Sequence, residues 1–411
     1  MKGIKKAFKY IGLIILGLFI AGNLVILLSG RLYIYKAIGS TYFRGNKGPS
    51  IYDLSVFNQR NVANGDTQHW AQGSATNLPK LNDEQKAFIE NLNPASFLVV
   101  WGDTIIHESY WEPHARTTIS NSFSMAKSVL SLLIGVAIEE GYIKSIDEPV
   151  SNYLPEFSGE KANITIRHIL TMSSGLSWSE SYVHPFCDVA ELYYDTDARD
   201  LSLNRRTIEE APGQTWRYKS GDTQVLLYIL EAATKQKLSD YASAKIWQKI
   251  GAESDAAWSL VSDEQSEEKA YCCLYATSSD FARLGKLVNQ NGKWNGVQII
   301  DSAYVSAFKS IAPLKKPNGK ANQLYGYQYW IYTGEDFEVT YFRGMLGQYI
   351  ISIPSKDLVI VRTGTGTLAN WENTKTQINE ALEGHRAELP EYINIGLSLL
   401  EKYKKSINFE L

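Results

Sequence analysis

Cysteine and histidine are scarce in this chain, with three cysteines and six histidines among 411 residues. Three cysteines are too few for a disulfide scaffold, and no two histidines stand at the spacing of metal ligands. We therefore expect no structural zinc site, no other metal and no organic cofactor. An oxidising compartment would allow one disulfide, and the sequence leaves open whether Cys187, Cys272 and Cys273 form one or stay buried thiols.

An excess of positive charge is also lacking. The 41 lysines and arginines are balanced by 44 aspartates and glutamates, for a net charge of −3. A chain that binds nucleic acid usually carries a basic surplus, so we expect no nucleic-acid partner. Hydrophobic residues make up 44% of the chain, a composition typical of globular proteins, and the length of 411 residues allows one large domain or two moderate ones.

One long hydrophobic run is present at the N-terminus. Lysines at positions 2, 5, 6 and 9 precede residues 11–28, which carry no charge. A helix of this length spans about 27 Å, close to the thickness of a bilayer core. Lysines before such a span indicate that the N-terminus lies in the cytoplasm. We expect residues 1–30 to be a single-pass membrane anchor with the following domain in the periplasm or outside the cell. A cleaved signal peptide and a buried helix are the alternatives.

The rest of the chain shows strand patterns at both ends and helix patterns in the middle. Residues 31–94 are predicted to be a connector that packs on a main domain over 95–385, and residues 386–411 a C-terminal extension. Strands are predicted over 96–101, 104–111, 339–343, 348–353 and 357–363. Helices are predicted over 81–92, 123–140, 165–172, 222–234, 238–250, 278–291 and 370–382. This order favours an α/β (α+β) fold, an antiparallel sheet flanked by helices, with a helical insertion at about 145–270.

A lysine occupies the first turns of the predicted helix over 123–140, which is apolar on nearly every side. Such a helix is buried, and burial depresses the pKa of a lysine. Ser124 precedes Lys127 by three residues and lies on the same helix face. A neutral lysine can act as the general base that a serine nucleophile needs, and the helix N-terminus stabilises a developing oxyanion. Ser124 and Lys127 are therefore a candidate catalytic pair.

The same serine-to-lysine spacing recurs at Ser158/Lys161, Ser266/Lys269 and Ser306/Lys309. Those segments are polar or mixed, so we expect solvated lysines there.

A second candidate element, Tyr218-Lys-Ser220, precedes the predicted helix over 222–234. A tyrosine here can act as a phenolate beside a lysine, or pass a proton to a leaving group. A packed aromatic in a turn is the alternative.

A third element is the glycine-rich segment from Arg343 to Gln348. Glycine in a strand often marks close approach of another backbone or a ligand, so a backbone N–H here can complete an oxyanion hole with that of Ser124. A glycine bulge is the alternative. Arg343 is a candidate for binding a carboxylate, with a surface salt bridge as the alternative.

Together, Ser124-Met-Ala-Lys127, Tyr218-Lys-Ser220 and the glycine-rich strand resemble the serine hydrolases of the class C β-lactamase type. That family includes penicillin-binding carboxypeptidases, D-aminopeptidases and carboxylesterases, and the resemblance runs from about Phe97 to Thr365. Residues 180–185 and 216–218 resemble its 6-aminohexanoate-dimer hydrolase branch. The resemblance implies a β-lactamase/transpeptidase-like fold.

The resemblance also implies roles for individual residues. Ser124 would be the nucleophile, with Lys127 and Tyr218 as its acid/base partners. Tyr182 would be a donor on the substrate side, and the N–H groups of Ser124 and Gln348 would form the oxyanion hole. Ser220 and Gly347 would lie beside the substrate.

The sequence departs from the penicillin-recognising members of the family. Met345-Leu346-Gly347 replaces their Lys-Thr-Gly, Ser220 replaces an asparagine, and Tyr193 stands where a dimer-hydrolase carboxylate aligns. These changes favour small amides or esters over β-lactams. We predict a membrane-anchored serine hydrolase that acts through an acyl-enzyme. The alternatives are a carboxylesterase, a D-amino-acid peptidase or β-lactamase-type enzyme, and a catalytically silent cell-envelope binding protein.

Overall fold

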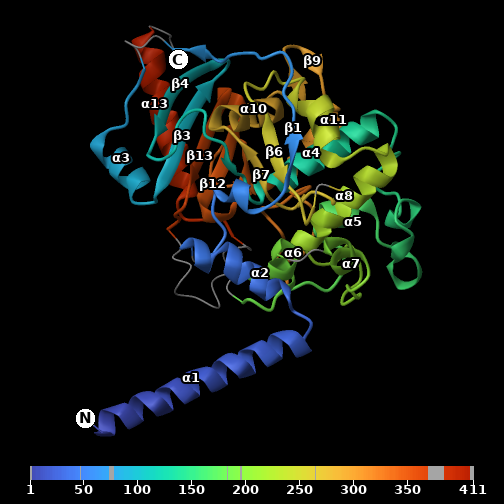
Figure 1. The fold of residues 1–411 in the computed structure, drawn as a ribbon. Coiled ribbons are helices and arrows are strands. Elements are labelled where there is room, and N and C mark those ends of the chain that lie inside the picture. Colours follow the sequence, from blue (N-terminus) through green and yellow to red (C-terminus); the bar gives the residue numbers. More distant parts are fainter. Residues whose placement is uncertain are drawn as a thin grey trace.

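A seven-stranded sheet forms the centre of the computed structural model (Figure 1). The structure describes residues 2–46, 48–73, 78–182, 184–194, 197–263, 265–368 and 384–407. The strands lie in the order β10 (Trp330–Tyr332), β11 (Val339–Gly344), β12 (Gln348–Ile353), β13 (Leu358–Gly364), β3 (Pro94–Trp101), β4 (Thr104–Tyr110) and β2 (Ala71–Gln72). Neighbours are antiparallel, except that β2 runs parallel to β4. The pairing of β13 with β3 confirms that strands from both ends of the domain build one sheet.

Both faces of this sheet are buried. Along β3, Leu98 belongs to one hydrophobic cluster, and its neighbours Phe97 and Val99 belong to another. This is the alternation that a strand imposes on its side chains. Helices α4 (Met125–Glu139) and α10 (Ser278–Asn289) cover the first face. Helices α3 (Asp83–Glu90) and α13 (Leu389–Ser406) lie on the second face, so the expected C-terminal extension packs directly on the sheet.

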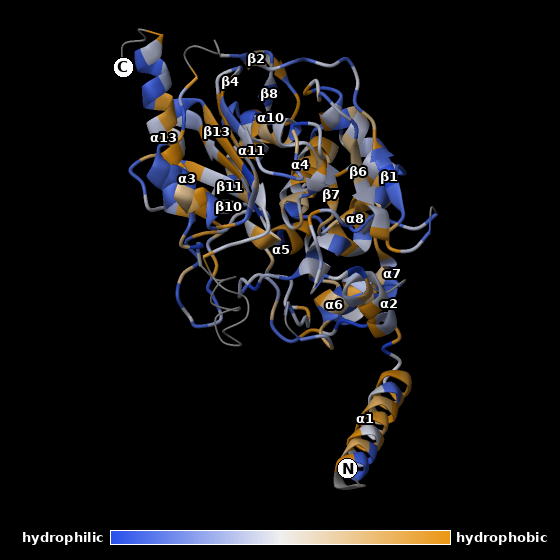
Figure 2. Ribbon diagram, turned by 60° about the vertical axis from the view of Figure 1, so that its left-hand side comes forward, coloured by the Kyte–Doolittle hydropathy of each residue, from blue (hydrophilic) through white to orange (hydrophobic). Residues whose placement is uncertain are grey.

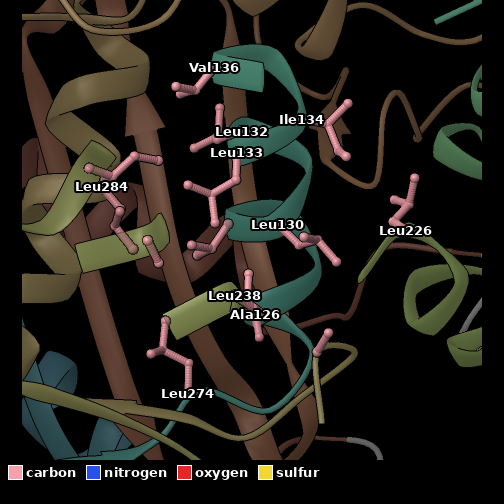
Figure 3. Close-up of a cluster of buried hydrophobic side chains, with 14 of the residues drawn as sticks. Ala126, Leu130, Leu132, Leu133, Ile134, Val136, Leu226, Leu238, Leu274 and Leu284 are labelled. Carbon is pink, nitrogen blue, oxygen red and sulfur yellow. The ribbon is translucent and has the colours of Figure 1, made fainter. Parts of the chain in front are cut away.

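Helix α4 is the buried helix that its apolar pattern predicts. Its labelled leucine and isoleucine side chains point both toward α10 and toward α8 (Ser220–Thr234), as Leu284 and Leu226 mark in Figure 3. Every residue from Met125 to Ala137 is buried, as expected of a helix that is apolar on all sides. Lys127 lies within this stretch, so its side chain is buried as well.

A second, smaller sheet was not predicted. It has the order β1 (Gln59–Val62), β6 (Ala256–Ser259), β7 (Leu274–Ala276) and β5 (Ser120–Asn121). Its strands have two to four residues, too few for a period-two pattern to stand out. Strand β5 ends just before Ser124, so this sheet supports the start of α4.

The inserted middle of the chain is helical, as predicted, although α5 and α9 are shorter than expected and α8 begins two residues earlier. It contains α5 (Ile166–Leu170), α6 (Asp188–Tyr194), α7 (Ala198–Leu203), α8 and α9 (Leu238–Ala242). The helix predicted over 238–250 is divided, because α9 passes into a π-helical turn at Ser243–Trp247. The helix predicted over 370–382 lies outside the described residues. Further elements are β8 (Lys293–Trp294), β9 (Val297–Gln298) and α11 (Ser302–Phe308).

Helix α1 (Lys2–Leu28) projects from the rest of the protein (Figure 2). Its segment Ile4–Leu28 is long and apolar enough to cross a membrane, and none of its most hydrophobic window is buried. Helix α2 (Tyr33–Ser40), which was not predicted, follows at once and packs on α6.

Candidate functional site

The turn before α4 places Ser124 at the edge of a cavity. Phe123 has a φ of 44°, a conformation that is uncommon for a bulky residue. Its N–H donates to the side chain of Asn121 at 2.8 Å, which holds the turn in place. Ser124 is half-buried and lines the cavity. Such strain is found where surrounding contacts hold a functional residue in position.

Lys127 lies directly behind Ser124. Its Nζ is 3.0 Å from Ser124 Oγ and 2.7 Å from the carbonyl oxygen of Tyr271, and only 1% of the residue is exposed. Burial lowers the pKa of Lys127 to about 7, while the negative charge of Glu180 opposes part of that shift. At neutral pH a large fraction of Lys127 is thus an uncharged amine that can accept the Ser124 proton.

Tyr218 completes the cluster from the segment before α8. Its side chain is hydrogen-bonded to Ser124, and Lys127 Nζ lies 5.1 Å from the centre of its ring. Burial raises the pKa of Tyr218 above its ordinary value. The phenol is therefore protonated at neutral pH, which favours a proton donor over a phenolate. The three predicted catalytic side chains are together.

Glu180 organises the substrate side of the cluster. Its carboxylate accepts hydrogen bonds from Tyr182 Oη at 2.6 Å, Ser220 Oγ at 2.7 Å and Ser220 N at 2.8 Å, and from Trp178 Nε1 at 2.5 Å. Tyr182 and Ser220 line the cavity as predicted, but each hydroxyl donates to Glu180. Glu180 was not among the predicted site residues, although it lies in the segment that resembles the dimer-hydrolase branch.

The glycine-rich segment contacts the turn before Ser124 through Gly344. A Cβ atom on Gly344 would lie 2.2 Å from the carbonyl oxygen of Ser122, so β11 approaches that backbone as only glycine permits. Met345 lines the cavity together with Ser124. The close approach expected of this glycine-rich segment is therefore seen at Gly344, next to the turn that carries Ser124.

Gln348 and Gly347 contact residues of the neighbouring strand β13. The buried Gln348 amide donates to the carbonyl oxygens of Met345 and Gly364, and its oxygen accepts from Gly364 N. Gly347, with a φ of 84°, lies against the guanidinium of Arg362. Within the described part of this segment, Met345 lines the cavity, whereas Gly347 and Gln348 do not. The placement does not support the predicted oxyanion role of Gln348.

Arg343 is not a surface residue. It is 4% exposed, its guanidinium lies 4.4 Å from the centre of the Trp330 ring, and it donates to the carbonyl oxygen of Gly384 at 2.8 Å. The surface salt bridge considered for Arg343 is therefore wrong.

The cavity has a volume of about 300 Å³ and mostly apolar walls. Ser124, Tyr182, Ser220 and Met345 line it together with residues of α2 and α6. Within the described part of the chain, the buried hydroxyls of Tyr193 and Tyr271 have no hydrogen-bond partner, and both residues line the cavity. They can hydrogen-bond a carbonyl or amide of a bound molecule.

A disulfide joins the adjacent residues Cys272 and Cys273, and Cys187 is a buried free thiol. Cys272 lines the cavity and directly follows Tyr271, whose carbonyl oxygen accepts from Lys127. The pairing that the sequence left open therefore lies within the active-site wall.

The chain is similar to several known proteins. The family model described as Beta-lactamase matches residues 86–383. The 6-aminohexanoate-dimer hydrolase of Paenarthrobacter ureafaciens is 26% identical over 326 residues, which are 74% of this chain and 78% of that protein.

Solved structures with this fold include a Bacillus anthracis protein whose assignment as a 6-aminohexanoate-dimer hydrolase is itself provisional. It has a TM-score of 0.72 and 21% identity, and the match covers 87% of this chain and 94% of that one. A family VIII carboxylesterase has a TM-score of 0.59 and 16% identity, covering 82% of this chain and 99% of that one.

Proposed function

This chain belongs to the beta-lactamase family and is a serine hydrolase, and from that premise we propose that it cleaves a small amide or ester through an acyl-enzyme on Ser124. The observation that carries the proposal is the contact of Ser124 with both Lys127 and Tyr218 at the edge of one cavity. A buried lysine that is partly neutral at pH 7 fits the role of base.

In this mechanism, Lys127 Nζ accepts the proton of Ser124 as Oγ attacks the substrate carbonyl. The N–H groups of Ser124 and Met345 are the donors we assign to the resulting oxyanion, because Met345 lines the cavity. The Tyr218 hydroxyl gives a proton to the leaving nitrogen or oxygen and is reprotonated from Lys127. Water then attacks the acyl-serine with Lys127 as base, which releases the acid and restores Ser124.

A carboxylesterase is the second candidate, because the apolar cavity suits an acyl chain and a family VIII carboxylesterase shares the fold. A fluorophosphonate probe tests for the nucleophile, since it labels an activated serine. Labelling at Ser124, followed by turnover of short amides and esters, supports the hydrolase. Absence of labelling and turnover supports the catalytically silent binding protein.

Replacing Tyr218 with Phe keeps the ring packing and removes only the hydroxyl. Proton relays of this kind contribute about 10²–10⁴-fold. Amides have a poorer leaving group than p-nitrophenyl esters, so we expect kcat/KM to fall in that range for amides and much less for the activated esters. Small and equal losses on both substrates, with Tm unchanged, would remove Tyr218 from the mechanism.

Glu180→Gln tests the group that orients Tyr182 and Ser220. An amide has one accepting oxygen, so it cannot accept all the hydrogen bonds that the carboxylate accepts, and its neutrality removes the charge that raises the Lys127 pKa. We expect kcat/KM to fall roughly tenfold to hundredfold, with the acidic limb of its pH profile moving to lower pH. The exposed Glu84→Gln on α3 is the matched control. A loss of rate without any shift of the limb would contradict the electrostatic role.

We further propose that α1 crosses the membrane and places the catalytic domain in the periplasm or outside the cell. The lysines before its apolar segment support this orientation. A reporter fused after residue 411 should be active only if it works outside the cytoplasm, and deletion of residues 1–30 should abolish that activity. Strong activity of a cytoplasm-only reporter at the same position would reverse the topology.

A further inference from the structure

We infer that the substrate is a membrane lipid or lipid-like amide or ester, whose hydrocarbon chain lies between the catalytic residues and α2 and which enters from the bilayer surface. The inference rests on the proposed hydrolase function and membrane anchorage, and it adds a substrate class and an entry side. Three features support it: residues of α2 line the cavity, α2 is hydrogen-bonded to α1, and apolar residues are exposed beside the junction of these two helices.

Helix α2 forms an apolar wall of the active-site cavity. Ile34, Ala37, Ile38 and Thr41 all line it. Their spacing of three and four residues puts them on one face of the helix. On α6, Val189 and Ala190 also line the cavity. A chain of methylene groups suits such walls, because each buried methylene contributes about 0.8 kcal/mol.

The same helix is tied to the membrane-spanning segment. Tyr35 Oη donates to Asn23 Oδ1 of α1 at 2.7 Å, and Ile26 of α1 packs against the cluster that contains Tyr33 and Ile34. Arg31, between the two helices, donates to the carbonyl oxygen of Phe186 at 2.7 Å. The end of α1 therefore contacts the wall of the cavity, and both views show α1 leaving the protein beside α2 and α6 (Figures 1 and 2).

Large apolar side chains are exposed at this junction. The exposed fractions are 56% for Leu32, 65% for Tyr42 and 85% for Phe43. Aromatic residues of this kind are enriched where proteins meet the headgroup region, and basic side chains such as exposed Arg44 attract anionic headgroups. A bilayer around α1 would cover these residues, whereas in water they would be a costly surface.

The test uses the full-length protein in phosphatidylcholine–phosphatidylglycerol vesicles. We compare p-nitrophenyl acetate with p-nitrophenyl octanoate, which share a leaving group and differ in chain length. The octanoate-to-acetate ratio of kcat/KM should be tenfold or more. Ile38→Asp, which puts a charge in the wall, should lower this ratio at least tenfold. Ala37→Leu, which narrows the cavity without charge, should lower it too, whereas the remote, exposed Val297→Asp should leave it unchanged.

A second arm tests the bilayer as the source. N-palmitoyl-7-amino-4-methylcoumarin is incorporated in the same vesicles, and Phe43→Ser should slow its cleavage at least fivefold relative to cleavage of p-nitrophenyl octanoate. Preference for octanoate without cleavage of the embedded amide would indicate a soluble amphiphile and overturn the membrane source. Equal kcat/KM for both esters, abolished by Ser124→Ala, would overturn the inference but leave the proposed hydrolase intact. Hydrolysis that survives Ser124→Ala would contradict the hydrolase itself.

Discussion

Ser124→Ala is expected to lower kcat/KM for every amide and ester substrate by about 10⁴-fold or more, since Ser124 Oγ is the proposed site of the acyl intermediate. The fold should persist. The Ser124 side chain makes no capping hydrogen bond to α4, so its loss removes no support from the helix. Far-UV circular dichroism and thermal unfolding measure the fold, and initial rates measure activity.

Ser306→Ala is the matched control. Ser306 is exposed on α11 and has the same spacing to a following lysine, so its replacement should leave both activity and Tm unchanged. Residual hydrolysis of more than a few per cent in Ser124→Ala, with no contaminating activity, would refute Ser124 as the nucleophile.

Lys127→Met is expected to change activity and stability in opposite directions. Removal of the base should lower kcat/KM by about 10³–10⁴-fold. Removal of a buried amine whose protonation the fold disfavours should raise the free energy of unfolding at pH 7 by about 1–4 kcal/mol. Active sites often hold residues that cost stability, and Lys127 has that character because it is nearly inaccessible to water.

The pH dependence gives a sharper criterion. Burial lowers the folded-state pKa of Lys127 from 10.5 to about 7. Between these values the unfolded chain binds a proton that the folded protein does not, so stability from this group increases as pH rises from 7 toward 10.5. Lys127→Met should remove that increase, and the wild-type kcat/KM should rise with pH around a midpoint near 7. The exposed Lys86→Met on α3 should alter neither quantity. A wild-type profile flat between pH 6 and 8 would contradict Lys127 as the base.

The sequence predicted those helices and strands whose hydrophobic pattern is long and lies within one continuous segment. The helix from Met125 to Glu139 and the five longer strands of the large sheet carry runs that identify them, whereas the short strands β2 and β10 were not predicted. Ser124 and Lys127 could be paired because they share one helix turn. Tyr218 required the order of motifs in a known family, because its approach to Ser124 depends on tertiary packing.

Other features depend on contacts that no local pattern records. Lys269 was expected to be solvated, yet it is fully buried, with its Nζ 3.2 Å from the centre of the Phe57 ring and 2.6 Å from the carbonyl oxygen of Tyr193. Its burial depends on Phe57, some two hundred residues earlier. Likewise, Gly344 and Gly347 lie three residues apart, and only the tertiary packing of β11 on the turn before α4 shows that Gly344 is the one next to Ser122.

The position of α2 has a consequence for how this protein can be shortened or released. The family match begins at residue 86, so a fragment cut at that boundary would omit α2 and the edge strand β1 that pairs with β6. Such a fragment would keep Ser124, Lys127 and Tyr218 but expose their cavity along one whole side. If α1 is the proposed anchor, a cut between α1 and α2 would instead release the domain with the residues of α2 still lining its cavity. The peptide bonds from Ser29 to Leu32 therefore mark where the proposed anchor can be removed while every residue that lines the cavity is kept.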